Sequence, residues 1–253
     1  VELKGVGKNL QDHLQARPIF KTNLRTINVE TDSFVKQALI GLRYLLTQTG
    51  PMTMAASLGV GFMKTAEHLE TPDIQFHIQP FSADAAVNGP HSFSAFTASV
   101  LQLRPESTGH LTLQSARPND HPKIYPNYLA TENDCRTIVR GIQVARRIAK
   151  YEPLKSHVTE EYAPGVGVDI DDDDATLDWA RRSAVTIYHP TGTCKMGTDD
   201  MAVVDPRLRV RGISGLRVAD ASIMPRIVSG NTNAPAIMIG AQASDLVLED
   251  ANA

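Results

Sequence analysis

Residues 187–197 read Ile187-Tyr-His-Pro-Thr-Gly-Thr-Cys-Lys-Met-Gly197, which places a histidine in a turn broken by proline and glycine. Further along, the chain reads Gly215-Leu-Arg-Val-Ala-Asp-Ala-Ser222 and then Ser229-Gly-Asn-Thr-Asn-Ala-Pro-Ala-Ile-Met-Ile-Gly240. Pro190 and Gly192 restrict and bend the backbone, so the ring of His189 can be held at a turn. A histidine alone in such a turn is more often structural than catalytic, so its meaning depends on the flanking pieces.

These three pieces resemble the C-terminal half of the glucose-methanol-choline (GMC) oxidoreductases, flavoenzymes that oxidise alcohols. The glycines, His189, Asp220 and Asn231 fall in the family's order and spacing. Leu101-Gln-Leu-Arg-Pro105 and Tyr125-Pro-Asn-Tyr-Leu129 look closer to the choline dehydrogenase and alcohol dehydrogenase branch than to the fungal sugar oxidases. The resemblance implies an FAD cofactor and a small-molecule alcohol substrate.

The start of the chain is similar to a motif that lies near the middle of family members. It reads Gly5-Val-Gly-Lys-Asn-Leu-Gln-Asp-His13, and the resemblance implies a structural or flavin-proximal role for its histidine rather than that of a base. We therefore expect the chain to be a fragment of a two-domain flavoenzyme. The sequence contains no G-x-G-x-x-G turn to hold the ADP end of FAD, so a truncated product that neither binds FAD nor turns over stays an alternative.

Composition favours a globular protein with no nucleic-acid partner. The 253 residues are 42% hydrophobic, and the formal net charge is -3, so there is no basic footprint for a polyanion or an anionic membrane. The sequence contains no run of 18 apolar residues, so it predicts no membrane span. Two widely separated cysteines, Cys135 and Cys194, suit a reducing compartment, so we expect a cytoplasmic location, in solution or peripheral to a membrane.

Hydrophobic periodicity predicts an α+β fold. Apolar spacing predicts helices over 33–49, 133–151 and 235–248, the last packing through Ile237, Gly240, Ala241, Ser244 and Leu248. Alternation predicts strands from 73, over 94–103 and over 109–115, which we expect to be antiparallel neighbours in one sheet, and short strands over 208–212 and 216–220. The loop over 83–92 is a candidate substrate-side lid.

The resemblance also implies a division into domains. Residues 1–15 and 201–253 would belong to an FAD-binding α/β domain, of which they form the C-terminal part. Residues 16–186 would form a substrate-binding domain, an antiparallel sheet backed by helices, and residues 187–200 would lie at the active-site seam.

Alcohol oxidation needs a base beside the hydroxyl, because the hydride leaves carbon more readily once the oxygen carries negative charge. Histidine suits this role, since its pKa lies near neutrality. With the matched flanks, His189 is the predicted base, and Asn231, where the family has His or Asn, is predicted to hold the same hydroxyl. Alternatively, Asn231 is only a turn residue, since Gly, Asn, Ser and Thr surround it and favour turns.

Four residues are predicted to contact the flavin. Asn233 has the pattern of the N-cap of the last helix, and a helix N-terminus favours the negative charge of reduced flavin. The resemblance places Asn233 and Ala234 beside the isoalloxazine, and Asp220 and Ala221 near the pyrophosphate and ribityl chain.

Other chemistries are less favoured by the sequence. A redox-silent relative that cleaves cyanohydrins, like the hydroxynitrile lyases, stays an alternative, and the electron acceptor of a redox enzyme is open between oxygen and a quinone-type carrier. His189 and Cys194 lack a second Cys/His pair for zinc. The acidic run 169–174 lacks the glycine and glutamate of a calcium loop and is predicted to begin a helix instead.

Overall fold

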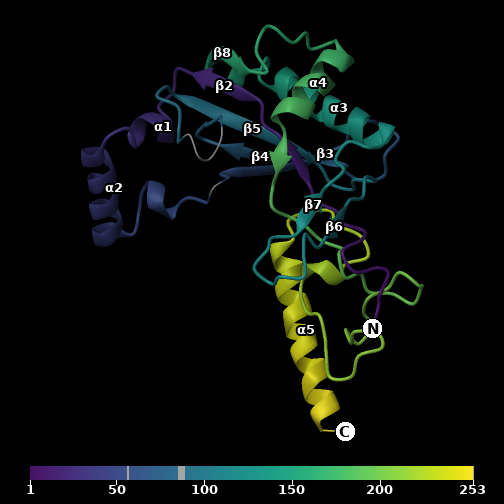
Figure 1. The fold of residues 1–253 in the computed structure, drawn as a ribbon. Helices are drawn as coiled ribbons and strands as arrows, with labels where there is room; N and C mark the ends of the chain where they lie inside the picture. Colours follow the sequence, from purple (N-terminus) through teal and green to yellow (C-terminus); the bar gives the residue numbers. More distant parts are fainter. Residues whose placement is uncertain (56, 85–88, 253) are drawn as a thin grey trace. The chain divides into compact units, whose positions relative to one another are not determined.

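The computed structural model describes residues 1–55, 57–84 and 89–252, and the chain divides into two compact units (Figure 1). Unit 1 comprises Val1–Leu14, Leu103–Cys135 and Thr186–Ala253. Unit 2 comprises Gln15–Gln102 and Arg136–Val185. Each unit is therefore assembled from segments that are distant in the sequence.

Unit 2 is built on a seven-stranded sheet with the order β3-β4-β5-β1-β9, to which β2 adds by pairing with β5 and β8. The pairings of β5 with β1, β2 and β4 are antiparallel, as are those of β3 with β4 and β2 with β8. The strands are β1 Leu14–Ala16, β2 Ile19–Thr22, β3 Gly59–Met63, β4 Ile74–Gln79, β5 Ala95–Gln102, β8 Val158–Ala163 and β9 Val185–Thr186. The predicted antiparallel sheet backed by helices is thus confirmed.

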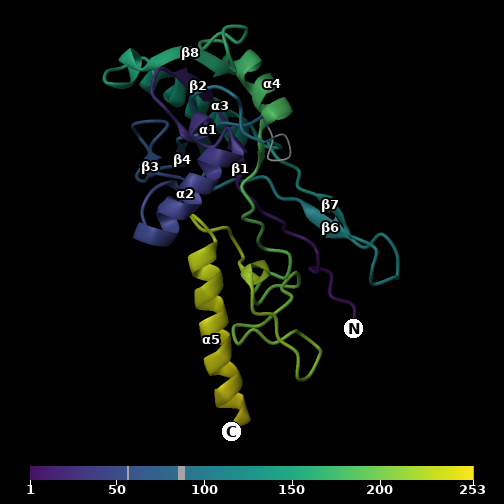
Figure 2. The same ribbon diagram turned by 90° about the vertical axis from the view of Figure 1, so that its left-hand side faces the viewer.

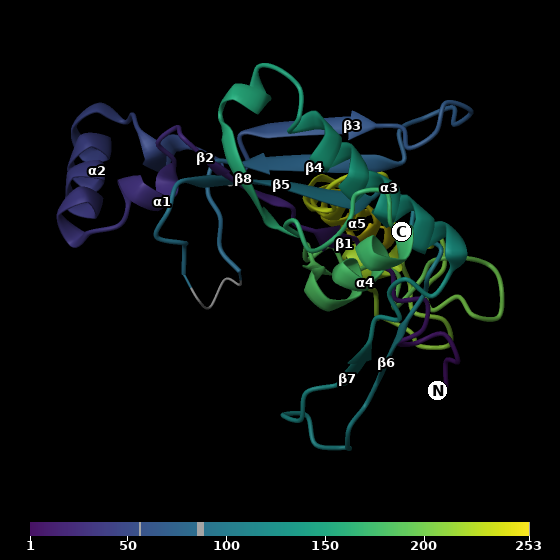
Figure 3. The same ribbon diagram turned by 90° about the horizontal axis from the view of Figure 1, so that it is seen from above.

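Helix α3, Glu132–Ile148, covers one face of this sheet, and Figure 3 shows it lying over the strands. Its Ile138, Ile142 and Ala145 are buried, as the periodicity predicts. Arg136, Arg140 and Arg147 are exposed, whereas the side chain of Arg146 is buried, and its Nε lies 2.7 Å from Glu161 Oε1. The ion pair fits the rule that a buried charge is compensated.

Helix α2, Phe34–Thr47, follows the short α1, Ile27–Glu30, and confirms the first predicted helix. Ser33 caps it by accepting from Lys36 N, and Gln48 ends it in a left-handed conformation. Most of its apolar residues are exposed in this structure, including Phe34, Leu39 and Leu45.

The acidic run also behaves as predicted. Helix α4, Asp173–Ser183, begins at the N-cap Asp172, whose carboxylate accepts from Ala175 N. Asp173 and Asp174 lie in its first turn, where negative charge complements the helix dipole.

Unit 1 contains a two-stranded sheet of β6, His110–Thr112, and β7, Lys123–Tyr125, and the terminal helix α5, Asn233–Ala251 (Figure 2). Short 3-10 turns complete the chain, among them η1 Pro51–Thr53 and η3 Leu154–Ser156 in unit 2 and η4 Ala221–Ile223 in unit 1. The core of unit 1 is an apolar cluster formed by Val203, Val204, Leu208, Val210, Ile223, Met224, Ile239, Ala243 and Leu246. Helix α5 therefore buries one stripe against irregular backbone and against the short η4, which contributes Ile223.

Three predictions of detail are wrong. The strand predicted over 109–115 forms β6, which pairs with β7 and is not a strand of the large sheet, while Gly109 forms an isolated bridge with Leu10. The strands predicted over 208–212 and 216–220 form only the isolated bridges Val204↔Val210 and Arg209↔Arg217. Helix α5 packs through Ile239, Ala243 and Leu246, whereas the predicted face is exposed, with Ile237 66% and Leu248 58% accessible. Apolar and small residues lie all round this helix, so its sequence does not single out one face.

Two further observations bear on the sequence predictions. Within the described ranges, no helix combines the length and the apolar character that a bilayer crossing requires. Of the candidate lid over 83–92, residues 85–88 lie outside the described residues.

Candidate active site

The His189 turn is held by the motif at the start of the chain. Gln11 and Thr191 exchange both backbone hydrogen bonds, at 3.1 and 2.8 Å, and Ile187 N donates to His13 O at 3.1 Å. Gly192 has a φ of +90°, and a Cβ there would lie 2.3 Å from Asn9 O. Glycine is therefore needed at this position both for the backbone conformation and for the close approach of the two segments.

Two amides of the same motif reach the segment that leads to Asn231. Asn9 Nδ2 donates to Gly192 O at 3.3 Å and to Pro225 O at 3.2 Å. Gln11 Nε2 also donates to Pro225 O at 3.1 Å, while its Oε1 accepts from Ile227 N at 3.2 Å. One short stretch of sequence thus holds both the histidine turn and the asparagine loop.

The structure brings His189 and Asn231 together, although 42 positions separate them in the sequence. Asn231 Nδ2 lies 3.4 Å from His189 Nε2, at the long limit of a hydrogen bond. His189 is 8% exposed and Asn231 is exposed, so one edge of the imidazole faces an accessible amide. The two side chains can therefore contact one small polar group between them.

Asp12 is a site residue that the sequence analysis missed. Its Oδ1 accepts from His189 N at 2.9 Å, and its Oδ2 accepts from Tyr128 Oη and Thr186 Oγ1, both at 2.5 Å. The residue is 8% exposed, and these donors satisfy its buried charge. The only sequence signal was its place in the motif that ends at His13.

Burial and Asp12 act in opposite directions on His189. Burial lowers the pKa of its imidazole below the ordinary 6.5, and the negative charge of Asp12 raises it by less. Burial, followed by the hydrogen bond to Asp12, raises the pKa of Tyr128 above its ordinary value, which keeps that phenol protonated. His189 is consequently neutral, and able to accept a proton, at neutral pH.

His13 lies directly behind His189. Its Nδ1 is 3.0 Å from His189 Nδ1, its Nε2 is 3.0 Å from Leu103 O, and the two rings meet at 82°. The ring of His13 has no exposed surface. His13 therefore contacts the predicted base directly.

The predicted flavin contacts lie around the same turn. Helix α5 begins at Asn233, two residues after Asn231, and the N-cap is Thr232 rather than Asn233, which corrects the expected cap position. The side chain of Thr232 makes no capping bond, and Asn233 and Ala234 are exposed residues of the first turn, where backbone N–H groups have no partner within the helix.

Asp220 and Ala221 begin η4 rather than ending a strand. Asp220 Oδ1 accepts from Ser222 N at 2.7 Å, and Ala221 O accepts from Gly192 N at 3.4 Å. Their backbone is thus tied to the His189 turn. Exposed helix N–H groups beside a neutral base fit a cofactor that becomes anionic on reduction.

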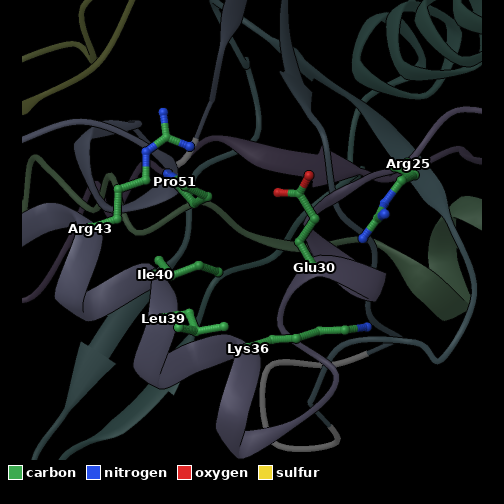
Figure 4. Close-up of a pocket in the computed structure, with 7 residues that line it drawn as sticks. All are labelled: Arg25, Glu30, Lys36, Leu39, Ile40, Arg43 and Pro51. Atoms are coloured by element: carbon green, nitrogen blue, oxygen red, sulfur yellow. The ribbon is translucent and has the colours of Figure 1, made fainter.

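A separate cavity of about 290 Å³ lies in unit 2 (Figure 4). Figure 4 shows Leu39, Ile40 and Arg43 extending from α2 and Glu30 facing them. The charged lining is already engaged in part, since Lys36 Nζ contacts Asp32. None of the predicted site residues lines this cavity.

Comparisons with known proteins address the family directly. The family profile described as GMC oxidoreductase matches residues 105–240. The chain belongs to this family. The predicted resemblance is therefore confirmed, and FAD is the cofactor of the GMC family.

Curated relatives share the predicted branch. The chain is 40% identical over 248 residues to an alcohol dehydrogenase [acceptor] of Pseudomonas putida, covering 98% of this chain and 45% of that protein. It is 41% identical over 249 residues to the mitochondrial choline dehydrogenase of Homo sapiens, covering 97% of this chain and 41% of that protein. The chain thus spans less than half the length of these relatives.

A solved structure supports the fold. A variant of formate oxidase from Aspergillus oryzae, studied for its effect on FAD modification, superposes with a TM-score of 0.89 at 25% identity. The match covers 99% of this chain and 48% of that one. The mixed helix and antiparallel-sheet architecture is therefore that of the corresponding part of a GMC flavoenzyme.

Proposed function

We propose that this chain supplies the base and the substrate-side sheet of an FAD-dependent enzyme that oxidises an alcohol to an aldehyde. The observation that carries the proposal is the 3.4 Å approach of Asn231 Nδ2 to His189 Nε2, on a histidine whose pKa is lowered by burial. Membership of the GMC family and relatives named as alcohol and choline dehydrogenases support the same activity.

His189 acts first, as the proton acceptor. Its neutral Nε2 takes the hydroxyl proton of the alcohol, so that the substrate oxygen gains negative charge as the C–H bond breaks. Asp12 fixes the backbone of His189 through the bond to its N–H, and its charge stabilises the imidazolium that forms.

Asn231 positions the substrate. Its amide donates to the same oxygen without titrating, which orients the hydroxyl toward His189. Losing such a donor costs on the order of 2–4 kcal/mol in transition-state stabilisation.

The cofactor would lie against four residues of this chain. Asn233 and Ala234 would contact it through the first turn of α5, and Asp220 and Ala221 through the start of η4. FAD, when bound, supplies the hydride acceptor. The positive end of α5 favours the negative charge that the cofactor gains.

The test is anaerobic rapid mixing of the FAD-loaded enzyme, in which the chain is combined with the upstream half of a GMC relative, with a panel of primary alcohols that includes choline. In His189→Gln, flavin reduction should slow roughly 10²- to 10⁴-fold because the proton acceptor is lost. The FAD content should not change, since the ring is not an anchor. The matched control is His110→Gln, on β6 in the same unit, which should reduce flavin at the normal rate.

Two results would contradict the proposal. Near-normal flavin reduction in His189→Gln would remove His189 as the base. Flavin that stays oxidised with every alcohol, while a cyanohydrin is cleaved, would favour the lyase alternative. Mixing the enzyme, once its flavin has been reduced by an alcohol, with oxygen or with a quinone would show which class of acceptor reoxidises it.

A further inference from the structure

His13 and His189 share a hydrogen bond between like atoms, which restricts where their protons lie. The Nδ1 atoms of the two rings are 3.0 Å apart, so one must donate and the other accept. The opposite edge of His13 settles the direction. Its Nε2 faces Leu103 O at 3.0 Å, and a carbonyl oxygen only accepts, so His13 Nε2 carries a hydrogen.

Burial restricts His13 to one proton. The ring has no exposed surface, and a second proton would place a positive charge in a site shielded from water. In the neutral ring, the nitrogen without hydrogen is Nδ1, which then accepts. His189 Nδ1 must therefore be the donor.

The consequence reaches the other edge of His189. A neutral imidazole with its hydrogen on Nδ1 has a lone pair on Nε2, and that atom faces the amide of Asn231. The amide nitrogen of Asn231 donates to such a lone pair. The contact of His189 Nε2 with Asn231 therefore requires the same tautomer as the contact of His189 Nδ1 with His13.

We propose that His13 is a positioning residue that sets the tautomer of His189, holding the hydrogen on Nδ1 so that Nε2 is the proton-accepting atom. In this arrangement, His189 Nδ1 donates to His13 Nδ1, and His13 Nε2 donates to Leu103 O. The importance of this tautomer for alcohol oxidation rests on the proposed function, whereas the tautomer itself is a property of the protein without substrate.

The arrangement differs from one in which a carboxylate orients a histidine. Asp12, the charged neighbour of His189, accepts from its backbone N–H and from two hydroxyl groups. The ring itself is oriented by the second, neutral imidazole. When His189 becomes an imidazolium, the bond from its Nδ1 to His13 becomes charge-assisted and hence stronger.

The proton positions can be measured directly by nitrogen NMR on FAD-loaded enzyme labelled with 15N-histidine. Protonated and unprotonated ring nitrogens have well-separated shifts, and the signals of His189 are assigned by their loss in His189→Gln. Above the pKa of His189, the unmodified enzyme should show a protonated Nδ1 and an unprotonated Nε2 on this residue. This readout does not depend on turnover.

Two substitutions separate the acceptor from simple packing. His13→Leu removes the acceptor, so His189 should lose its single tautomer, and flavin reduction should slow roughly 10²- to 10⁴-fold with little change in KM. His13→Asn places an amide oxygen near the former Nδ1, so it should restore both the Nδ1-protonated signal and most of the rate. The control His110→Leu, also in unit 1, should leave the tautomer of His189 unchanged.

Several outcomes would overturn the inference. A protonated Nε2 on His189 in the unmodified enzyme would show that His13 is the donor. A His13→Leu enzyme that is slow while His189 keeps its tautomer would reduce His13 to a packing role. If His13→Leu does not fold, the unmodified and His13→Asn spectra still decide. A wrong proposed function would appear differently, as the expected tautomer in an enzyme whose flavin no alcohol reduces.

Discussion

Asp12 shows how one buried carboxylate can organise several groups. It accepts a backbone N–H from His189 and hydroxyl hydrogens from Tyr128 and Thr186, which joins three separate segments of unit 1. Its charge also opposes the effect of burial on the pKa of His189, without reversing it. The pH response of the site therefore depends on a residue that does not bond the imidazole.

Asp12→Asn should make His189 harder to protonate. The amide oxygen can still accept from His189 N–H, but the negative charge that raises the pKa of His189 is lost, so that pKa should fall further. The acid limb of the flavin-reduction rate, along which His189 gains a proton, should move to lower pH. A rate–pH profile of the FAD-loaded enzyme measures it, with Asp199→Asn, at an exposed position, as control.

An acid limb that stays in place or moves to higher pH in Asp12→Asn would contradict this account.

The lowered pKa of His189 also affects the stability of the folded chain, with a definite sign. Because folded His189 binds a proton less readily than the unfolded residue at 6.5, its contribution is present above about pH 6.5 and is lost as the pH falls below it.

At the scale of elements, the helices differ in how far their sequences determine their packing. The apolar stripe of α3 predicts its buried face, because charged residues occupy most of the remainder. Gly141 lies on that face, and a Cβ there would be 2.7 Å from Val100 Cγ2 on β5. Gly41, in α2, has no atom within 4 Å of the same position.

These two glycines form a matched pair. Gly141→Ala should destabilise unit 2 by about 1–3 kcal/mol, since the added methyl overpacks the contact between α3 and β5. Gly41→Ala should stabilise it by up to about 1 kcal/mol, since alanine has the higher helix propensity and meets no obstacle. Urea unfolding followed by Trp179, the single tryptophan of the chain and part of α4, measures both. Equal effects of the two substitutions would contradict the close packing of α3.

At the scale of the whole molecule, the chain crosses repeatedly between its two units. Unit 1 takes three segments and unit 2 takes two, and every residue of the His189 site belongs to unit 1. The site is therefore completed only when the first 14 residues, the segment 103–135 and the C-terminal segment have come together.

Residues 1–253 expressed by themselves should not retain FAD. The sequence has no G-x-G-x-x-G turn to bind the pyrophosphate, and the start of α5 offers only a few N–H groups. Flavin absorbance after gel filtration with added FAD is the measurement, and co-expression with the upstream half of a GMC relative is the comparison. Stoichiometric yellow colour in the isolated chain would show that these contacts suffice.

The sequence by itself determined the family, the periodic helices and the order of His189, Asp220 and Asn231, because these depend on local spacing and on residue type. It paired His189 with Asn231 only through resemblance, and it predicted no contact of His13 or Asp12 with His189. Only the tertiary structure brought His13 within 3.0 Å of His189, across 176 positions of sequence. The packing of the opening motif against the histidine turn depends on contacts between residues far apart in the sequence. The same holds for the hydrogen bond between His13 and His189 and for the buried face of α5, because each depends on which neighbours the folded chain supplies.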